Sequence, residues 1–150
     1  MKIILQTLFI IGVSLNYLTY SYALDSTYLK VKGGELEIIG EPYEMKIMFN
    51  DKRLPSGDGY NFSIKNKFSL ADSDIVLIEV ALGGNACGTL YYFVTISHRG
   101  AAKITDEIGA CEEEPKLKFN GSELTIKFSN KTYIYSNGKF TENGKPYKKF

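Results

Sequence analysis

The side chains that could carry nucleophilic chemistry are few: the chain has one histidine, His98, and two cysteines, Cys87 and Cys111. A serine or cysteine nucleophile needs a base beside it, and His98 is the only imidazole that could serve. His98 begins the turn-like segment His98-Arg99-Gly100, so we expect a solvated turn residue. The sequence has no Walker loop, no Gly-x-Ser-x-Gly elbow and no His-Glu-x-x-His helix. It therefore predicts no enzyme, no metal site and no cofactor, although a pair of carboxylates would leave no sequence signature.

The two cysteines favour a disulfide. Their even number fits an oxidising compartment, and a bridge between Cys87 and Cys111 would close a loop of 24 residue steps. Loop closure of that length stabilises a fold by roughly 3 kcal/mol through the entropy of the unfolded chain. The alternatives are a reactive thiol, or a zinc site that would need more ligands than two thiolates and one histidine.

The segment Leu-Pro-Ser-Gly-Asp-Gly-Tyr at residues 54–60 has two interpretations. Proline presets its backbone angle, serine and aspartate bond the backbone of a turn, and glycine tolerates positive φ, so the segment could be only a turn. Tyr60 would then be the first core residue of the next strand, because it is in phase with Phe62 and Ile64. In the other interpretation the segment is a loop that contacts a partner.

The elements that must position these residues have the pattern of short antiparallel strands. Alternation or apolar character predicts strands at residues 28–32, 36–39, 43–49, 75–82, 90–96, 116–119, 123–128 and 132–136. Within residues 43–49, Tyr43, Met45, Ile47 and Phe49 form the apolar face. Residues 75–82 are apolar on both faces apart from Glu79, and residues 90–96 are rich in β-branched and aromatic side chains, so both are expected to be central strands. The last third, with Asn137-Gly138 and Asn143-Gly144 as hairpin turns, is expected to be a meander.

These segments predict an all-β protein, an antiparallel sandwich or small barrel of about 8–10 short strands. Any helix would be a turn or two within residues 101–108.

The N-terminus has the pattern of a secretory signal peptide. Lys2 precedes an apolar run at residues 3–13, and Ser21-Tyr22-Ala23 fits the small-x-small cleavage rule, which predicts a signal at 1–23 and a single β domain at 24–150. We therefore expect a periplasmic or secreted protein with no stable membrane insertion after cleavage. This domain has 17 basic and 17 acidic side chains, and that balance argues against a nucleic-acid partner.

The segment Ser56-Gly57-Asp58-Gly59-Tyr60 is similar to the Ser-Gly-x-x-Tyr loop of the bacterial periplasmic lysozyme inhibitors, which are small exported β proteins. The resemblance implies that Ser56 and Tyr60 contact the catalytic groups of a lysozyme, with Gly57 allowing close backbone approach. Inhibitors of this family tend to oppose a strongly basic enzyme with an acidic surface, whereas this domain is close to neutral overall. Two alternatives remain open: an immunity protein against a toxin of the cell envelope, or an envelope-associated carbohydrate-binding or hydrolytic protein. Oligomeric state is not predicted.

The first testable prediction is the Cys87–Cys111 disulfide. Intact mass should rise by two hydrogens on reduction, and neither thiol should react with an alkylating agent in the native, unreduced protein. Alkylation of both cysteines before reduction would show that the bridge is absent.

Overall fold

The structure is a computed structural model, and it describes residues 22–57, 59–83, 88–109, 111 and 114–148. The described residues form antiparallel strands in three sheets, and they contain no helix long and apolar enough to cross a membrane. The all-β antiparallel class predicted from the sequence is confirmed. The described strands number fourteen, more than expected, because the edges of each sheet carry pieces of two to five residues.

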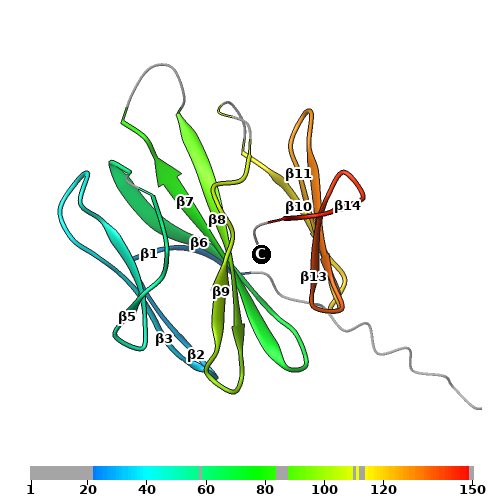
Figure 1. Ribbon diagram of the computed structural model, residues 1–150, viewed down its shortest axis with the longest axis horizontal. Helices are drawn as coiled ribbons and strands as arrows, with labels where there is room; N and C mark the ends of the chain where they lie inside the picture. The colour runs from blue at the N-terminus through cyan, green and yellow to red at the C-terminus, as the bar shows by residue number, and fades with distance from the viewer. Residues whose placement is uncertain (1–21, 58, 84–87, 110, 112–113, 149–150) are drawn as a thin grey trace, which may run out of the picture.

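A central sheet lies between the other two (Figure 1). Its strand order is β1-β6-β7-β8-β9. The strands are β1 (Tyr22–Ser26), β6 (Asn61–Ser69), β7 (Ser73–Ala81), β8 (Thr89–Ser97) and β9 (Ala102–Ile104). The predicted central strands are thus β7 and β8. The predicted signal cleavage after Ala23, which stays a prediction, falls within β1.

The N-terminal sheet covers one face of the central sheet. It consists of β2 (Tyr28–Val31), β3 (Gly34–Ile39), β4 (Lys46–Phe49) and β5 (Lys52–Arg53), in sequence order. The hairpin expected around Gly33 and Gly34 joins β2 to β3, with Val31 opposite Gly34. Strand β4 begins only at Lys46, so the expectation that Tyr43 belongs to the apolar face of this strand is wrong.

The C-terminal sheet covers the other face, as the predicted meander. Its strands, in sequence order, are β10 (Lys116–Phe119), β11 (Glu123–Lys127), β12 (Thr132–Ser136), β13 (Lys139–Glu142) and β14 (Lys145–Pro146). The Asn-Gly turns have positive φ at both residues, 50° and 73° at Asn137-Gly138 and 48° and 77° at Asn143-Gly144. Those angles match the two-residue hairpin turn that the dipeptide favours.

Alternation along the central strands divides the apolar side chains between two cores. The N-side core lies between the central and N-terminal sheets and takes Val76, Ile78 and Val80 from β7. The C-side core lies between the central and C-terminal sheets and takes Ile75 and Leu77 from the same strand. A strand that is buried on both faces must be apolar at nearly every position, which explains the sequence of residues 75–82.

A bulge in β6 lets one strand serve both cores. Ile64 pairs with Ile78 and Asn66 with Leu77, so Lys65 is the inserted residue of the bulge. Because an extra residue reverses the facing of all that follow, Phe62 and Ile64 enter the N-side core whereas Phe68 enters the C-side core.

The expected helical turn at residues 101–108 is not formed. Ala102 pairs with Ile96 and Ile104 with Val94, and Ile108 makes an isolated bridge with Tyr91. Ala102 and Ile104 pack against the N-side core. Apolar side chains at every second residue of this short segment therefore favour a strand over a helix.

Candidate functional site

The most distinctive surface feature is an exposed pair of aromatic rings, Tyr43 and Tyr60. Tyr43 lies between β3 and β4, and Tyr60 immediately precedes β6. Their ring centroids are 5.2 Å apart with an interplanar angle of 65°, an edge-to-face contact. Tyr43 is 58% exposed and Tyr60 44%. The alternative interpretation of Tyr60 as the first core residue of its strand is therefore wrong, and we call the two rings the aromatic pair.

The backbone under the aromatic pair is held in place. The Tyr43 amide donates to the Gly59 carbonyl at 3.2 Å, and the Tyr60 amide donates to the Ala81 carbonyl at 2.7 Å. Tyr43 has φ of 68°, and a bulky residue in this region costs about 1–3 kcal/mol. The surrounding structure thus maintains an unfavourable backbone conformation at an exposed tyrosine.

Two glycines let the chain pack closely beneath the rings. A Cβ at Gly59 would lie 2.7 Å from Val80 Cγ1, inside the N-side core. Gly83 has φ of 71°, and a Cβ there would lie 2.9 Å from the Cβ of Tyr60. A larger residue at Gly83 would displace Tyr60, and a larger residue at Gly59 would displace Phe62 or Val80, so the aromatic pair sits on a support shaped for glycine.

The first half of the 54–60 segment is fixed through Tyr92. Leu54 is buried in the N-side core, and the Gly57 amide donates to Tyr92 Oη at 2.6 Å. Tyr92 Oη in turn donates to Glu107 Oε1 at 2.9 Å. Burial is the main cause that raises the pKa of Tyr92 far above its usual range, so the phenol stays protonated and keeps this donor.

The three predicted contact residues have different surroundings. Tyr60 and Gly57 are exposed, whereas the Ser56 hydroxyl oxygen is buried and has no hydrogen-bond partner among the described residues. Asp58 lies outside the described residues. Within this segment, therefore, the Tyr60 ring is available to a partner and the Ser56 hydroxyl faces inward.

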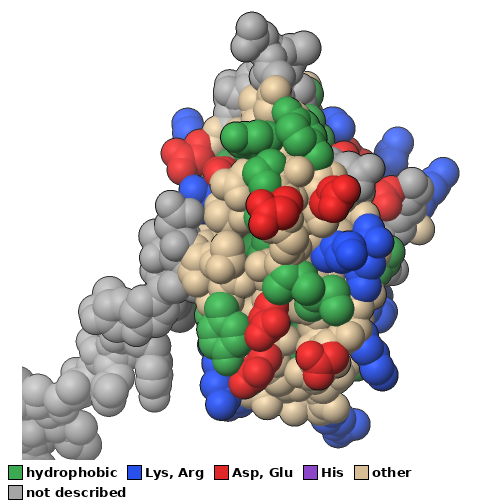
Figure 2. Space-filling view, turned by 90° about the vertical axis from the view of Figure 1, so that its left-hand side faces the viewer, with side chains coloured by type: hydrophobic (Ala, Val, Ile, Leu, Met, Phe, Trp, Pro, Cys, Tyr) green, Lys and Arg blue, Asp and Glu red, His purple; other side chains and the backbone are tan. Residues whose placement is uncertain are grey.

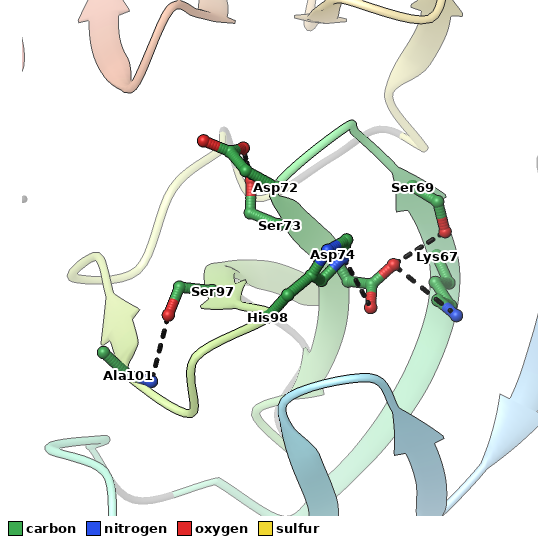
Figure 3. A network of polar contacts seen from close by, with 8 residues as sticks. All are labelled: Lys67, Ser69, Asp72, Ser73, Asp74, Ser97, His98 and Ala101. Atoms are coloured by element: carbon green, nitrogen blue, oxygen red, sulfur yellow. Dashed lines mark hydrogen bonds and ion pairs between the residues drawn. The ribbon is translucent and has the colours of Figure 1, made fainter.

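His98 is mostly buried, contrary to the expectation of a solvated turn residue. Its side chain is 19% exposed, and its amide donates to the Asp72 carbonyl at 2.9 Å. Figure 3 shows the His98 ring beside Asp74, with Nε2 3.7 Å from Oδ2. Asp72 lies in the turn between β6 and β7, so this turn fixes the backbone of His98. The residue types alone did not indicate this contact.

Asp74 organises the polar cluster around His98. Its side chain is 2% exposed, Ser69 Oγ donates to Oδ1 at 2.6 Å, and Lys67 Nζ lies 3.6 Å from the same oxygen. A nucleophilic serine would have to bond the imidazole, but Ser69 bonds the carboxylate instead. The cluster therefore has the bonding of a buried ion pair and not of a catalytic triad.

Among the surface hollows lined by described residues, two are larger than a third one of about 160 Å³ beside Glu35 and Glu37. One, of about 450 Å³, lies between the central and C-terminal sheets and is lined by Asp72, Thr95, Ser97 and Tyr135, among others. The second, of about 560 Å³, is lined by Asp106, Glu142, Lys145 and Tyr147, among others.

The two carboxylates of the second hollow are the kind of pair that a hydrolase would need. Glu142 Oε1 accepts a hydrogen bond from Tyr133 Oη at 3.2 Å and lies 3.5 Å from Lys131 Nζ. This carboxylate is thus already neutralised by its neighbours. Among the described residues, no group of three His, Cys, Asp or Glu side chains could hold a metal ion.

The predicted disulfide stays a prediction because Cys87 lies outside the described residues. The Gly88 amide donates to the Cys111 carbonyl at 3.2 Å, so the residue after Cys87 is next to Cys111.

Charge is unevenly distributed along the chain, although the total is balanced. Residues 24–114 carry nine basic and fifteen acidic side chains, whereas residues 115–150 carry eight lysines and two glutamates. The aromatic pair belongs to the acidic part, with Glu41 and Glu44 exposed beside Tyr43. Figure 2 shows the side of the molecule formed by the N-terminal sheet, where hydrophobic patches alternate with acidic and basic side chains.

The second testable prediction concerns Tyr92→Phe. The substitution removes the acceptor of the Gly57 amide and the donor to Glu107, so the free energy of unfolding should fall by about 1 kcal/mol. The Gly57 amide should also exchange with solvent much faster. Denaturant titration and hydrogen exchange measure the two effects, with Tyr28→Phe, an exposed tyrosine, as the control. Unchanged protection of Gly57 would contradict the role given to Tyr92.

No protein-family model, curated protein or solved structure matches this chain. Function is therefore inferred from the geometry of the described residues and from the loop resemblance.

Proposed function

We propose that this is an exported binding protein that uses the aromatic pair and the 54–60 loop to engage a protein partner, and that the partner is a lysozyme-like muramidase. The observation that carries the proposal is the exposed Tyr43–Tyr60 pair on its glycine-shaped support. The Ser-Gly-x-x-Tyr resemblance suggests the muramidase and the blocking of its cleft.

Rigidity of the loop supports this proposal. Leu54 is anchored in the N-side core, Gly57 is bonded to Tyr92, and Tyr60 is bonded through its amide to Ala81. A loop held at three points loses little conformational entropy on binding, so more of the contact energy appears as affinity. Tyrosine is also enriched among the residues that dominate interface energies.

Charge supports the proposal as well. Lysozyme inhibitors of the family that this loop resembles oppose a basic enzyme with an acidic surface, and the part of this chain that carries the aromatic pair has an excess of six acidic side chains. Complementary charge mainly accelerates association and selects partners.

The geometry changes the expected contribution of each loop residue. The inward position of the Ser56 hydroxyl argues against a direct contact by that group, whereas the Tyr60 ring is available. Tyr43, which the sequence pattern placed in a core, joins Tyr60 as a proposed contact. Gly57 would act through its position against Tyr92 and Glu107, because a Cβ there would lie 2.9 Å from Glu107 Oε1.

A hydrolytic function is the second candidate, and the hollow that contains Asp106 and Glu142 is the observation that favours it. Degradation of cell-wall substrate by the purified protein alone, lost in Asp106→Asn, would support this candidate. The engagement of Glu142 by Lys131 and Tyr133 makes the binding function the better supported of the two.

The third testable prediction is inhibition of a lysozyme. Lysis of cell-wall substrate by representative lysozyme classes should be reduced by the purified protein. Tyr60→Ala and Tyr43→Ala should each weaken inhibition by at least about 10-fold, as expected for interface anchors. Ser56→Ala should change it less than either.

Tyr28→Ala is the matched control, because Tyr28 is 45% exposed and belongs to β2, outside both the aromatic pair and the 54–60 segment. Each variant should be checked for native stability by thermal unfolding. If no lysozyme class is inhibited, the muramidase proposal fails. If inhibition persists in both Tyr43→Ala and Tyr60→Ala, the contact surface lies elsewhere.

A further inference from the structure

The outer face of the C-terminal sheet carries four lysines. In this sheet Leu124, Ile126, Tyr133, Tyr135 and Phe140 point into the C-side core. Their strand neighbours therefore point away from it. The outward residues include Lys116 and Lys118 on β10, Lys127 on β11 and Lys139 on β13, all of which are exposed. We call these four residues the lysine face.

The lysine face is not neutralised by the protein itself. Within the part of the chain that the structure describes, none of its four ammonium groups forms an ion pair, whereas Lys30 on the N-terminal sheet lies 3.7 Å from Glu35. Glu123 is the acidic residue on the outward side of β11, and its partners in register are Ser136 and then Lys139. The face thus has a clear excess of positive charge.

One pairing makes this arrangement costly. Lys116 lies directly opposite Lys127 in the β10–β11 register. Like charges at directly opposite positions destabilise a sheet. Lysines often protect the edge of a sheet, but β11 is an interior strand, so edge protection does not explain Lys127. An external anion would relieve the repulsion.

The shape of the face indicates which anion. Lys118 is aligned across the sheet with Thr125, Ile134 and Thr141, so short or medium side chains separate the lysines. The outward residues of β10–β13 include no aromatic ring, and single-stranded nucleic acids are normally bound by stacking on such rings. An array of lysines without a stacking ring fits the phosphates of a surface better than it fits a single-stranded nucleic acid.

We propose that the lysine face docks on an anionic phospholipid surface. Attraction to phosphate headgroups contributes roughly a five-fold increase in membrane partition for each lysine near the surface. Four lysines would together produce an increase of several hundred-fold, on the order expected for a reversible peripheral contact. The attraction would be weakened by salt, because the Debye length is about 8 Å at physiological ionic strength.

The fourth testable prediction is binding to anionic vesicles, measured by co-sedimentation. The purified exported protein should bind vesicles of phosphatidylcholine mixed with phosphatidylglycerol far better than vesicles of phosphatidylcholine alone. The quadruple variant Lys116→Gln, Lys118→Gln, Lys127→Gln, Lys139→Gln should lose at least about 100-fold in partition. The double variant Lys116→Gln, Lys127→Gln removes the opposed pair without burying any group, so it should fold well and lose about 25-fold.

The matched control removes the same charge from the N-terminal sheet: Lys30→Gln, Lys46→Gln, Lys52→Gln and Arg53→Gln, all at exposed positions. It should retain most of the binding. An equal loss in the control would show that net charge matters and the lysine face does not. Equal binding to neutral vesicles would overturn the proposal, as would binding to polyphosphate or duplex DNA without binding to vesicles.

Discussion

The burial of β7 on both faces is the constraint on which the rest of the structure depends. Val76, Ile78 and Val80 pack in the N-side core, while Ile75 and Leu77 pack in the C-side core one residue away. Within the described part of the chain, neither outer sheet is covered by a further sheet, and each buries its apolar side chains against the central sheet. The fold is therefore one unit with a shared middle layer, and each surface feature inherits its rigidity from that layer. The support under Tyr60, for example, reaches Val80 through Gly59.

Much of this architecture could be predicted from the sequence because its signals are local. A run that is apolar at nearly every position requires cover on both faces, and residues 75–82 show such a run. Asn137-Gly138 supplies the positive φ angles of a tight turn without help from the rest of the chain. The contribution of β6 to both cores was not predictable in this way, since it depends on the bulge at Lys65, which changes the facing of this strand only in the context of its pairing with β7.

The candidate site was partly predictable for the same reason. The 54–60 loop was identified by its composition, but its partner Tyr43 was assigned to a strand because its alternation with Met45 and Ile47 is perfect. Tertiary contacts overrule that pattern, since the Tyr43 amide donates to the Gly59 carbonyl and the φ angle of Tyr43 is positive.

The lysine face was missed because the charge of the whole domain, counted together, balances to zero. A separate count over residues 115–150 shows the excess of lysine, and the strand register then shows that four of these lysines share one face of the C-terminal sheet.

The shared middle layer is tested most directly by native-state hydrogen exchange in the Leu77→Ala variant. Leu77 contacts the C-side core, and its truncation should cost about 2–5 kcal/mol. If β7 couples the two cores, the slowest amides of β3 and β4 in the N-terminal sheet should lose as much exchange free energy as those of β11 and β12 in the C-terminal sheet. Faster exchange confined to the C-terminal sheet, with the N-terminal sheet unchanged, would contradict this account.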